Sequence, residues 1–415
     1  MKITKIVGRE IYDSRGWPTV SCELTLENEI TVSAAAPSGT SKSAYEACEL
    51  RDGGKRLWGQ GVTRAVESID HIIAPAVLGR EPDGQSLDMI MLELDGTPNK
   101  SHLGSNAMIA ASMAIYQAQA LIEDMNLFEL IATLMGCDTV TMPFPQFNII
   151  NGGVHAHNQL AVQEVLIVPV GVEHFRSAME LSVMVFHELR NILCRDGKDN
   201  GVGLEGGLVP SVNIEEALVL LSEAVNRVSG NNEVPLVIAL DCAASQWYDH
   251  ATKKYYVQGK NMTTNQLLDW YQELTETYPI YSLEDPFSEH DWQGWTKITK
   301  SIGERVQIVA DDLCATNPDR ILLAAQKNAM TAVVIKPNQI GTITETLHAI
   351  KLCKEHNINT VISHRSGDTS DTFIADLAVG SSAGQIKAGG CCRSERVAKY
   401  NRLLAIEDLL FTRLM

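Results

Sequence analysis

The spacing of hydrophobic residues changes character near Gly136. Before it, residues 20–26 alternate between apolar and polar, and a second apolar run follows at 30–36, which predicts a β-hairpin. Across about 62–78 and 106–134, apolar residues recur every three or four positions, so we expect a helix in each segment. Strands followed by helices indicate an α+β unit that ends near Gly136.

After a proline-containing junction at 138–147, short apolar runs alternate with helix-like stretches, and each run ends in a polar residue. In order, these terminal residues are Asp241, Glu284, Asp311, Lys336, His364 and Lys387. Continuous apolar runs are typical of parallel strands buried on both faces, and most of the intervals fit one βα unit. Because the strand ends of a β/α barrel meet at one mouth, we expect one shared site. A doubly wound open sheet is the main alternative.

Composition limits the partners and the compartment. The chain has 415 residues, with 34 Lys and Arg against 51 Asp and Glu, a net charge of −17. This balance argues against nucleic acid and anionic membranes as partners, but it does not exclude an anionic substrate in a local pocket. No secretory or membrane-spanning segment is expected. The nine cysteines include no CxxC pair, which favours reduced thiols in the cytoplasm.

Three of the strand-end residues are carboxylates, namely Asp241, Glu284 and Asp311. Carboxylates that share one mouth repel one another, and a hard divalent cation removes that conflict. Ligation by oxygen alone, without His or Cys, favours Mg²⁺ over Zn²⁺. The alternative for each residue is a solvated acid at the end of a strand, but three in register predict a magnesium site.

Two strand-end lysines suggest a base. Ammonium groups at Lys336 and Lys387 are expected to lower each other's pKa, which would make a neutral lysine base possible. The alternative is a lysine that extends out of the barrel. Between them lie His364, Arg365 and Ser366, whose donors suit a phosphate or a carboxylate.

Candidate acids precede the first strand-end carboxylate. Glu164 follows Gln163, and Glu205 lies in a glycine-flanked loop where a carboxyl group could act as a general acid. A Ser- and Gly-rich loop at 36–47 is a candidate lid, or only a loop. A base, an acid and a divalent ion suit abstraction of a proton beside a carboxylate, followed by β-elimination.

Eleven segments resemble, in order along nearly the whole chain, the motifs of the enolase family. They are DSRGWPTV, APSGTS, NIINGGVHAHN, QEV, LDCAAS, SLEDPF, VADDL, KPNQIGTITET, SHRSGDTSDT, AGQIK and RSERVAKYN. The resemblance implies an α+β N-terminal cap domain at 1–136 followed by a modified β/α (TIM-like) barrel at 137–415. It implies a cytoplasmic, glycolytic homodimer with phosphopyruvate hydratase activity, a lyase that interconverts 2-phosphoglycerate and phosphoenolpyruvate. The expected partner is therefore a small, anionic phosphorylated carboxylate.

The same resemblance implies roles for individual residues. On the metal and base side, Lys336 is the implied base and Lys387 binds the substrate carboxylate. The implied Mg²⁺ ligands are Asp241, Glu284, Asp311 and the lid serine Ser38. On the acid side, Glu205 is the implied general acid, supported by Glu164. The implied contacts to substrate are His155, Glu164, Glu284, Asp311, His364, Arg365, Ser366 and Lys387.

Several positions depart from the family pattern. Acids usual in the family are replaced at His157, Ala161 and Leu204, and a cation appears at Lys42. Further departures are Trp17, Gln246, Pro337 and the segment 388–390. These changes are compatible with ordinary drift in a working enolase. They also suit a paralogue acting on a more anionic phospho- or phosphono-carboxylate in a biosynthetic pathway. A non-catalytic protein of the same fold is a third alternative, but it predicts losses among the implied ligands, and none is lost.

Overall fold

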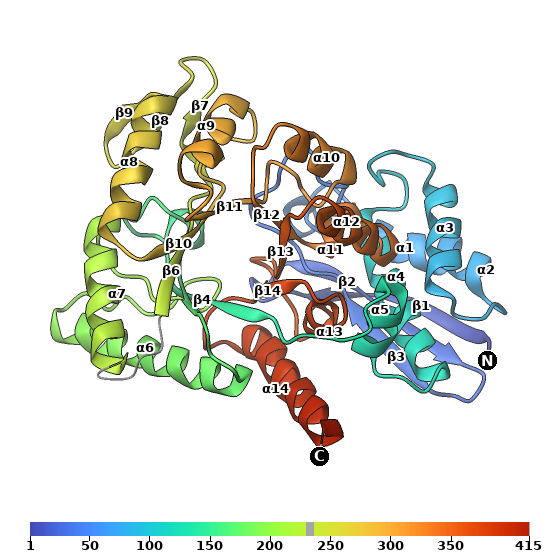
Figure 1. Cartoon of the computed structure of the whole chain (residues 1–415). Helices are drawn as coiled ribbons and strands as arrows, with labels where there is room; N and C mark the ends of the chain where they lie inside the picture. Colours follow the sequence, from blue (N-terminus) through green and yellow to red (C-terminus); the bar gives the residue numbers. More distant parts are fainter. Residues whose placement is uncertain (230–235, 415) are drawn as a thin grey trace.

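The N-terminal part of the chain is built on a three-stranded antiparallel sheet (Figure 1). The computed structural model describes residues 1–229 and 236–414. Strands β1 (Ile3–Tyr12), β2 (Pro18–Leu26) and β3 (Thr31–Ala35) pair in that order. The predicted hairpin is therefore confirmed as β2 and β3. Strand β1 was not predicted, because exposed charged residues interrupt its apolar positions.

Helices follow the sheet in this part of the chain, and several of them pack against it. They are α1 (Thr63–Ser68), a π-helical segment (Ile69–Ile73), α2 (Ala74–Val77), α3 (Gly84–Asp95), α4 (Ser105–Ile122) and α5 (Leu127–Met135). The expected helix at 62–78 is confirmed as a continuous helical stretch. The single helix expected at 106–134 is wrong: α4 ends at Ile122, and Asn126 begins α5 with a capping box. The apolar spacing continues across this break, so periodicity alone did not reveal it.

Eight strands close into a barrel, which confirms the predicted architecture (Figure 1). In the order of the barrel they are β10 (Ile280–Glu284), β11 (Gln307–Ala310), β12 (Ala332–Ile335), β13 (Asn359–Ser363), β14 (Gly384–Lys387), β4 (Phe144–Asn151), β5 (Glu164–Pro169) and β6 (Leu236–Asp241). The run predicted at 234–241 begins with two residues that lie outside the described part of the chain.

Strand β5 makes this barrel a modified one, because it runs antiparallel to both of its neighbours. The other neighbouring pairs are parallel. The reversed direction brings the first residue of β5, Glu164, level with Asn151 and Asp241, the last residues of β4 and β6. A strand that starts at the mouth thus contributes to the same site as strands that end there.

Helices and short connections surround the barrel. The helices are α6 (Phe175–Arg195), α7 (Ile214–Ser229), α8 (Thr264–Thr277), α9 (Trp292–Ile302), α10 (Pro318–Gln326), α11 (Pro337–Ile340), α12 (Ile343–Glu355), α13 (Phe373–Gly380) and α14 (Ser394–Leu414). Short 3₁₀ turns lie at Arg56–Gly59, Gly153–His155 and Ala244–Trp247. The small sheet β7 (Tyr248–Asp249), β8 (Lys254–Val257) and β9 (Lys260–Met262) explains the long interval between β6 and β10.

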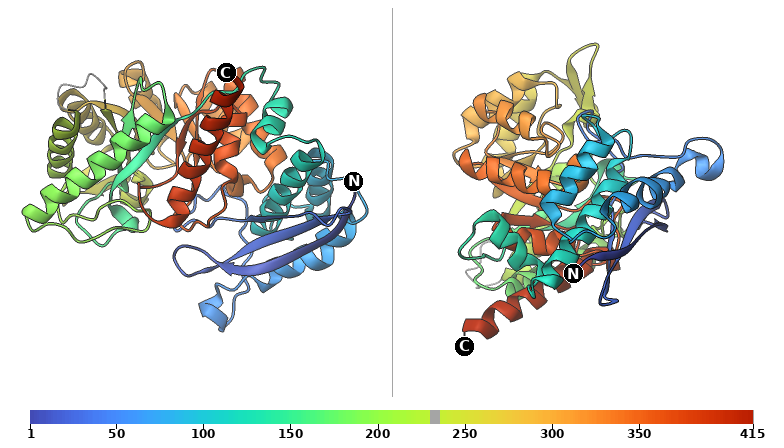
Figure 2. Two further views of the ribbon diagram at one scale, coloured as in Figure 1. Left: turned by 90° about the horizontal axis from the view of Figure 1, so that it is seen from below. Right: turned by 90° about the vertical axis from the view of Figure 1, so that its right-hand side faces the viewer.

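Helix α4 lies at the seam between the two parts, since it contacts β2 and β3 on one side and α11 and α12 on the other. Figure 2 shows the N-terminal sheet beside the barrel, and it shows α14 crossing the outer surface of the barrel. At the seam the Ser112 hydroxyl accepts a hydrogen bond from the backbone N–H of Ile343 at 3.0 Å. In the described part of the chain, no helix has both the length and the apolar character needed to cross a membrane.

Candidate active site

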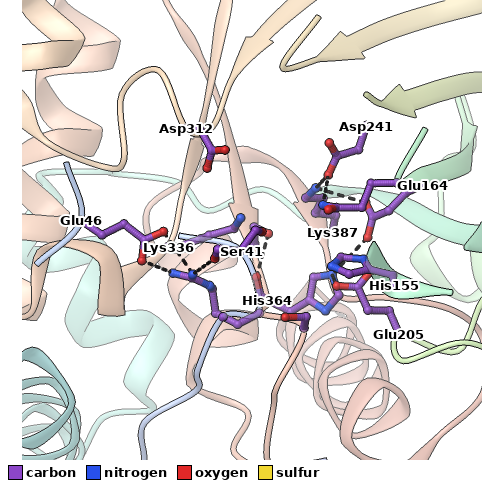
Figure 3. Close-up of a pocket in the computed structure, with 15 residues that line it drawn as sticks. Ser41, Glu46, His155, Glu164, Glu205, Asp241, Asp312, Lys336, His364 and Lys387 are labelled. Carbon is purple, nitrogen blue, oxygen red and sulfur yellow. Dashed lines mark hydrogen bonds and ion pairs between the residues drawn. The ribbon is translucent and has the colours of Figure 1, made fainter. Parts of the chain in front are cut away.

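The barrel mouth holds a narrow, strongly polar pocket (Figure 3). Its cavity volume of about 20 Å³ is close to the room that one water molecule needs. Nine of the residues expected from the sequence line it: His155, Glu164, Glu205, Asp241, Lys336, His364, Arg365, Ser366 and Lys387. Glu284 and Asp311 contact the two lysines of this set. The structure thus gathers side chains that lie more than two hundred residues apart.

The Lys387 ammonium is the centre of one side of the pocket. It donates to Glu164 at 3.2 Å, to Asp241 at 3.1 Å and to Glu284 at 2.7 Å, and all these side chains are buried. Burial alone would lower the pKa of Lys387, but the surrounding carboxylates raise it well above its usual value. Burial and the nearby Asp241 charge raise the pKa of Glu284 well above its usual value.

Lys336 makes an ion pair with Asp311 on the same side. Burial alone would lower the pKa of Lys336, but the Asp311 carboxylate outweighs it and raises the pKa above the usual value. The charge of Lys387 lowers the pKa of Lys336, as expected, but the expected net lowering is wrong. The carboxylates paired with each ammonium outweigh the repulsion between the lysines.

The acids of this side fit a hard cation by their chemistry. Asp241, Glu284 and Asp311 are carboxylates at the ends of three neighbouring strands. Asp241 and Glu284 both contact the single nitrogen of Lys387, so a positive charge satisfies both at once. Oxygen donors of this kind suit Mg²⁺.

The tightest acidic groups differ from the predicted ligand set. Among the described residues, the groups whose ligand atoms all lie within 4.8 Å are Asp285 with Asp311 and Asp312, and His155 with Glu164 and Glu205. Asp285 was missed from the sequence. Its carboxylate accepts the backbone N–H groups of Asp311 and Asp312, both at 2.9 Å, and so fixes the end of β11. Asp285 therefore positions Asp311.

The opposite side of the pocket holds an acid–imidazole pair. The Nδ1 atom of His155 lies 3.0 Å from a carboxylate oxygen of Glu205, and both residues are buried. Burial would lower the pKa of His155 and raise that of Glu205, but the attraction between the pair reverses both shifts. These directions favour a proton on His155 and an ionised Glu205. Asn148, also missed from the sequence, donates to Glu164 and to Glu205, both at 3.1 Å.

His364 faces this acid side. Its Nε2 lies 3.8 Å from carboxylate oxygens of both Glu164 and Glu205. Its Nδ1 contacts a guanidinium nitrogen of the fully buried Arg396 at 2.6 Å. Because a guanidinium only donates, Nδ1 must accept, and the ring proton is on Nε2. Burial lowers the pKa of His364 well below its usual value, so the ring is neutral.

The loop at 36–47 lies over the mouth. The guanidinium of Arg365 pairs with Glu46 at 2.9 Å and donates to the Ser41 carbonyl at 3.1 Å. Any side chain at Gly39 would collide with this guanidinium, since a Cβ there would lie 1.8 Å from a nitrogen of Arg365. The Ser366 hydroxyl accepts the backbone N–H of Thr40 at 2.8 Å.

The role of Ser38 as a metal ligand stays a prediction. Its buried hydroxyl accepts from Arg15 at 2.9 Å and Arg51 at 3.0 Å, and Ser38 does not line the pocket. Ser41, three positions further on, is the serine of this loop that does. A Ser- and Gly-rich loop has no periodicity to indicate which hydroxyl faces inward.

The residues that depart from the family pattern lie in several parts of the structure. The ammonium of Lys42, expected to add positive charge to the pocket, instead pairs with Glu49 at 2.5 Å, and its side chain is 45% exposed. Pro337 begins α11, where the missing N–H costs nothing. Trp17 packs edge-on against Trp58, outside the pocket. Gln246 donates to Gln163 at 3.1 Å.

Comparison with known proteins agrees with the fold and the site. The model of the enolase N-terminal domain matches residues 3–131, and the model of the enolase C-terminal TIM barrel domain matches residues 139–413. A relative from Corynebacterium kroppenstedtii, named Enolase, is 45% identical over 411 residues, which cover 99% of this chain and 96% of that protein. The chain therefore belongs to the enolase family.

Proposed function

We propose that the protein is a Mg²⁺-dependent lyase that interconverts 2-phosphoglycerate with phosphoenolpyruvate and water. One observation carries the proposal: two lysine side chains held by carboxylates face an imidazole–carboxylate pair, His155 and Glu205, across a single small pocket. A base and an acid on opposite sides are what a β-elimination needs. The relative named Enolase supports the same reaction.

Lys336 is the proposed base. Once the hold of Asp311 on its ammonium is relaxed, Lys336 would release one proton to solvent, and the neutral amine would then take the proton from carbon 2 of the substrate. Asp241, Glu284 and Asp311 would hold Mg²⁺, and Ser38 of the loop at 36–47 is the fourth proposed ligand. When bound, the cation would neutralise these carboxylates and polarise the substrate carboxylate.

Other residues would bind and orient the anionic substrate. The Lys387 ammonium would pair with the substrate carboxylate as it exchanges partners with Asp241 and Glu284. Arg365 and Ser366, which now contact the loop at 36–47, offer donors to the phosphate. His364 presents an Nε2–H donor beside the acid pair. These residues fix which face of the substrate meets Lys336.

The acid step belongs to Glu205 and His155. The hydroxyl on carbon 3 would leave as water after it receives a proton, and the His155–Glu205 pair holds one within 3.0 Å. Glu164 and Asn148 would orient the Glu205 carboxylate. The low pKa of Glu205 means that the proton must reach the leaving group from His155 or through Glu205 as an intermediary.

The remaining proposals concern the whole protein. We propose a homodimer in the cytoplasm with a glycolytic role and a domain division at 136/137, supported by the family resemblance. Nine free cysteines fit a reducing compartment. Sedimentation of the purified chain would test the dimer.

The decisive assay follows phosphoenolpyruvate formation by its ultraviolet absorbance, with 2-phosphoglycerate and Mg²⁺. We expect turnover that stops on chelation and returns when Mg²⁺ is restored. Retained Mg²⁺ binding without any dehydration of 2-phosphoglycerate would reject this substrate and favour the paralogue alternative. Exchange of the carbon 2 proton with solvent, measured in the same samples, reports the first half of the reaction separately.

A further inference from the structure

A second cavity lies directly beside the acid side of the active site. Its volume is about 370 Å³, far larger than that of the catalytic pocket. One wall is the segment around His155, and the other is the segment that leads to Glu205 and includes Leu204. His155 lines both cavities, so the second cavity borders the catalytic pocket at this residue.

The lining of this cavity is basic and free of acid. No Asp or Glu lines it, although the chain as a whole carries a charge of −17. The Nε atom of Arg393 donates to Glu395 at 3.2 Å, and among the described residues its two terminal nitrogens have no hydrogen-bond partner. His157 is exposed and has no hydrogen bond or ion pair within that part of the chain. Arg393 and His157 thus offer unused N–H donors.

Two departures from the family pattern meet in this cavity. His157 and Leu204 are both positions where the family usually has an acid, and both line it although 47 residues separate them in the chain. A carboxylate at either position would face Arg393 across the cavity and would compete with any anionic ligand. Leu204 instead adds to an apolar wall shared with Val154 and Val202.

We propose that this cavity binds an anionic oxygen-rich group, a phosphate or a carboxylate, held by Arg393 and His157 next to Glu205. The inference rests on the proposed function, because it is Glu205 and His155 that relate the cavity to the leaving-group side of the substrate. The group has two possible sources. It can be a substituent on carbon 3 of the substrate, or a separate small anion that occupies the cavity beside an ordinary substrate.

The first experiment tests the separate anion. Inorganic phosphate is titrated into the full-length protein saturated with Mg²⁺ and phosphoenolpyruvate, and binding is followed by phosphorus NMR. We expect saturable binding that weakens by about tenfold in Arg393→Gln and in His157→Asp. Arg393→Lys, which keeps the positive charge, is the matched control and should lose less phosphate affinity than Arg393→Gln.

The second experiment tests the substituent. 2-Phosphotartrate is 2-phosphoglycerate with a carboxylate on carbon 3. If the cavity receives that group, 2-phosphotartrate acts as a substrate or a competitive inhibitor, and its kcat/KM or inhibition constant worsens by about tenfold in Arg393→Gln. The kcat/KM for 2-phosphoglycerate should stay unchanged in that variant, because Arg393 does not touch the catalytic pocket.

Each result decides something. A loss in Arg393→Gln of either phosphate binding or the response to 2-phosphotartrate supports the cavity site. The experiment in which the loss occurs identifies the source of the anion. If phosphate does not bind and 2-phosphotartrate behaves identically in the wild type and in Arg393→Gln, the cavity proposal is overturned. Turnover of 2-phosphoglycerate is measured in the same preparations, so failure of the proposed function would appear as a separate result.

Discussion

The two sides of the active site are built differently. On the base side, Lys336 and Lys387 lie at the ends of barrel strands and pair with carboxylates at the ends of other barrel strands. On the acid side, His155 and Glu205 lie in connections between elements, and their orientation depends on side chains such as Asn148. Three of the family departures, at 157, 161 and 204, lie in the connections of the acid side.

This difference shows how one scaffold can keep one half of a reaction while changing the other. Barrel strands fix the positions of their terminal residues through backbone pairing, so a change there disturbs the whole sheet. Connections carry fewer such constraints and accept substitution. We therefore expect proton abstraction to be the conserved half-reaction, and substrate discrimination to depend on the acid side.

The largest effect should come from Lys336→Ala. Without a base, exchange of the carbon 2 proton and dehydration should both fall by about 10²–10⁴-fold. Measuring both rates with 2-phosphoglycerate and Mg²⁺ tests the assignment. Lys100→Ala is a control, since Lys100 is also buried but pairs with Glu345 outside the pocket. Exchange that persists in Lys336→Ala would exclude Lys336 as the base.

Glu205→Gln should separate the two sides. The substitution keeps the shape of the side chain but removes its charge, so dehydration should fall by about 10²-fold. Exchange of the carbon 2 proton should stay within about threefold, because Lys336 and its partners are unchanged. An equal fall in both rates would mean that the two sides do not act independently.

Metal affinity should follow the base side alone. Asp241→Asn removes one proposed ligand charge and should weaken Mg²⁺ binding by about tenfold or more. Glu205→Gln should leave Mg²⁺ affinity almost unchanged. Calorimetric titration of the chelator-treated proteins would compare them, and equal affinities in wild type and Asp241→Asn would remove Asp241 from the ligand set.

The base side was also the more predictable from the sequence. Asp241, Glu284, Asp311, Lys336 and Lys387 each end an apolar run, or directly follow one, so strand register alone brings them to one mouth. Strands β4 and β5 were not predicted, and in β4 a proline and polar residues interrupt the apolar pattern. Consequently the reversed direction of β5, which explains the place of Glu164, was not predicted either.

The remaining misses have one cause: they depend on contacts that local pattern does not encode. Arg396 reaches the carbonyl of Leu204 across 192 positions of the chain, and no spacing rule reveals such a partner. The error in the lysine pKa values arose in the same way. Which acid pairs with each ammonium depends on the three-dimensional packing, which residue spacing does not reveal.

Arg396 offers a smaller and more specific test of the acid side. Its guanidinium donates to Nδ1 of His364 and to the carbonyls of Arg365 and Ser366. In Arg396→Met the His364 ring is free to carry its proton on Nδ1 instead of Nε2. Because the Nε2–H donor is then lost, kcat/KM for 2-phosphoglycerate should fall by about tenfold. Nitrogen NMR of the His364 ring gives a readout that a merely structural role would not change. A bare Nδ1 in both proteins would reject Arg396 as the residue that sets the tautomer.

The smallest expected effect is the pH dependence of stability from His155 and Glu205. The pKa of Glu205 lies below its usual value, so its contribution is present above about pH 4.5 and is lost as the pH falls. The pKa of His155 lies above its usual value, so its contribution is full below about pH 6.5 and is lost as the pH rises through the raised pKa. The pair therefore stabilises the folded protein most between these two pH limits.

The measurement compares the melting temperatures of the wild type and Glu205→Gln. The wild type should exceed the variant by about 2 °C more at pH 6 than at pH 9. His157→Ala, which alters an exposed imidazole, should show no such difference, and a constant gap between wild type and Glu205→Gln at all pH values would mean that the pair is not charged.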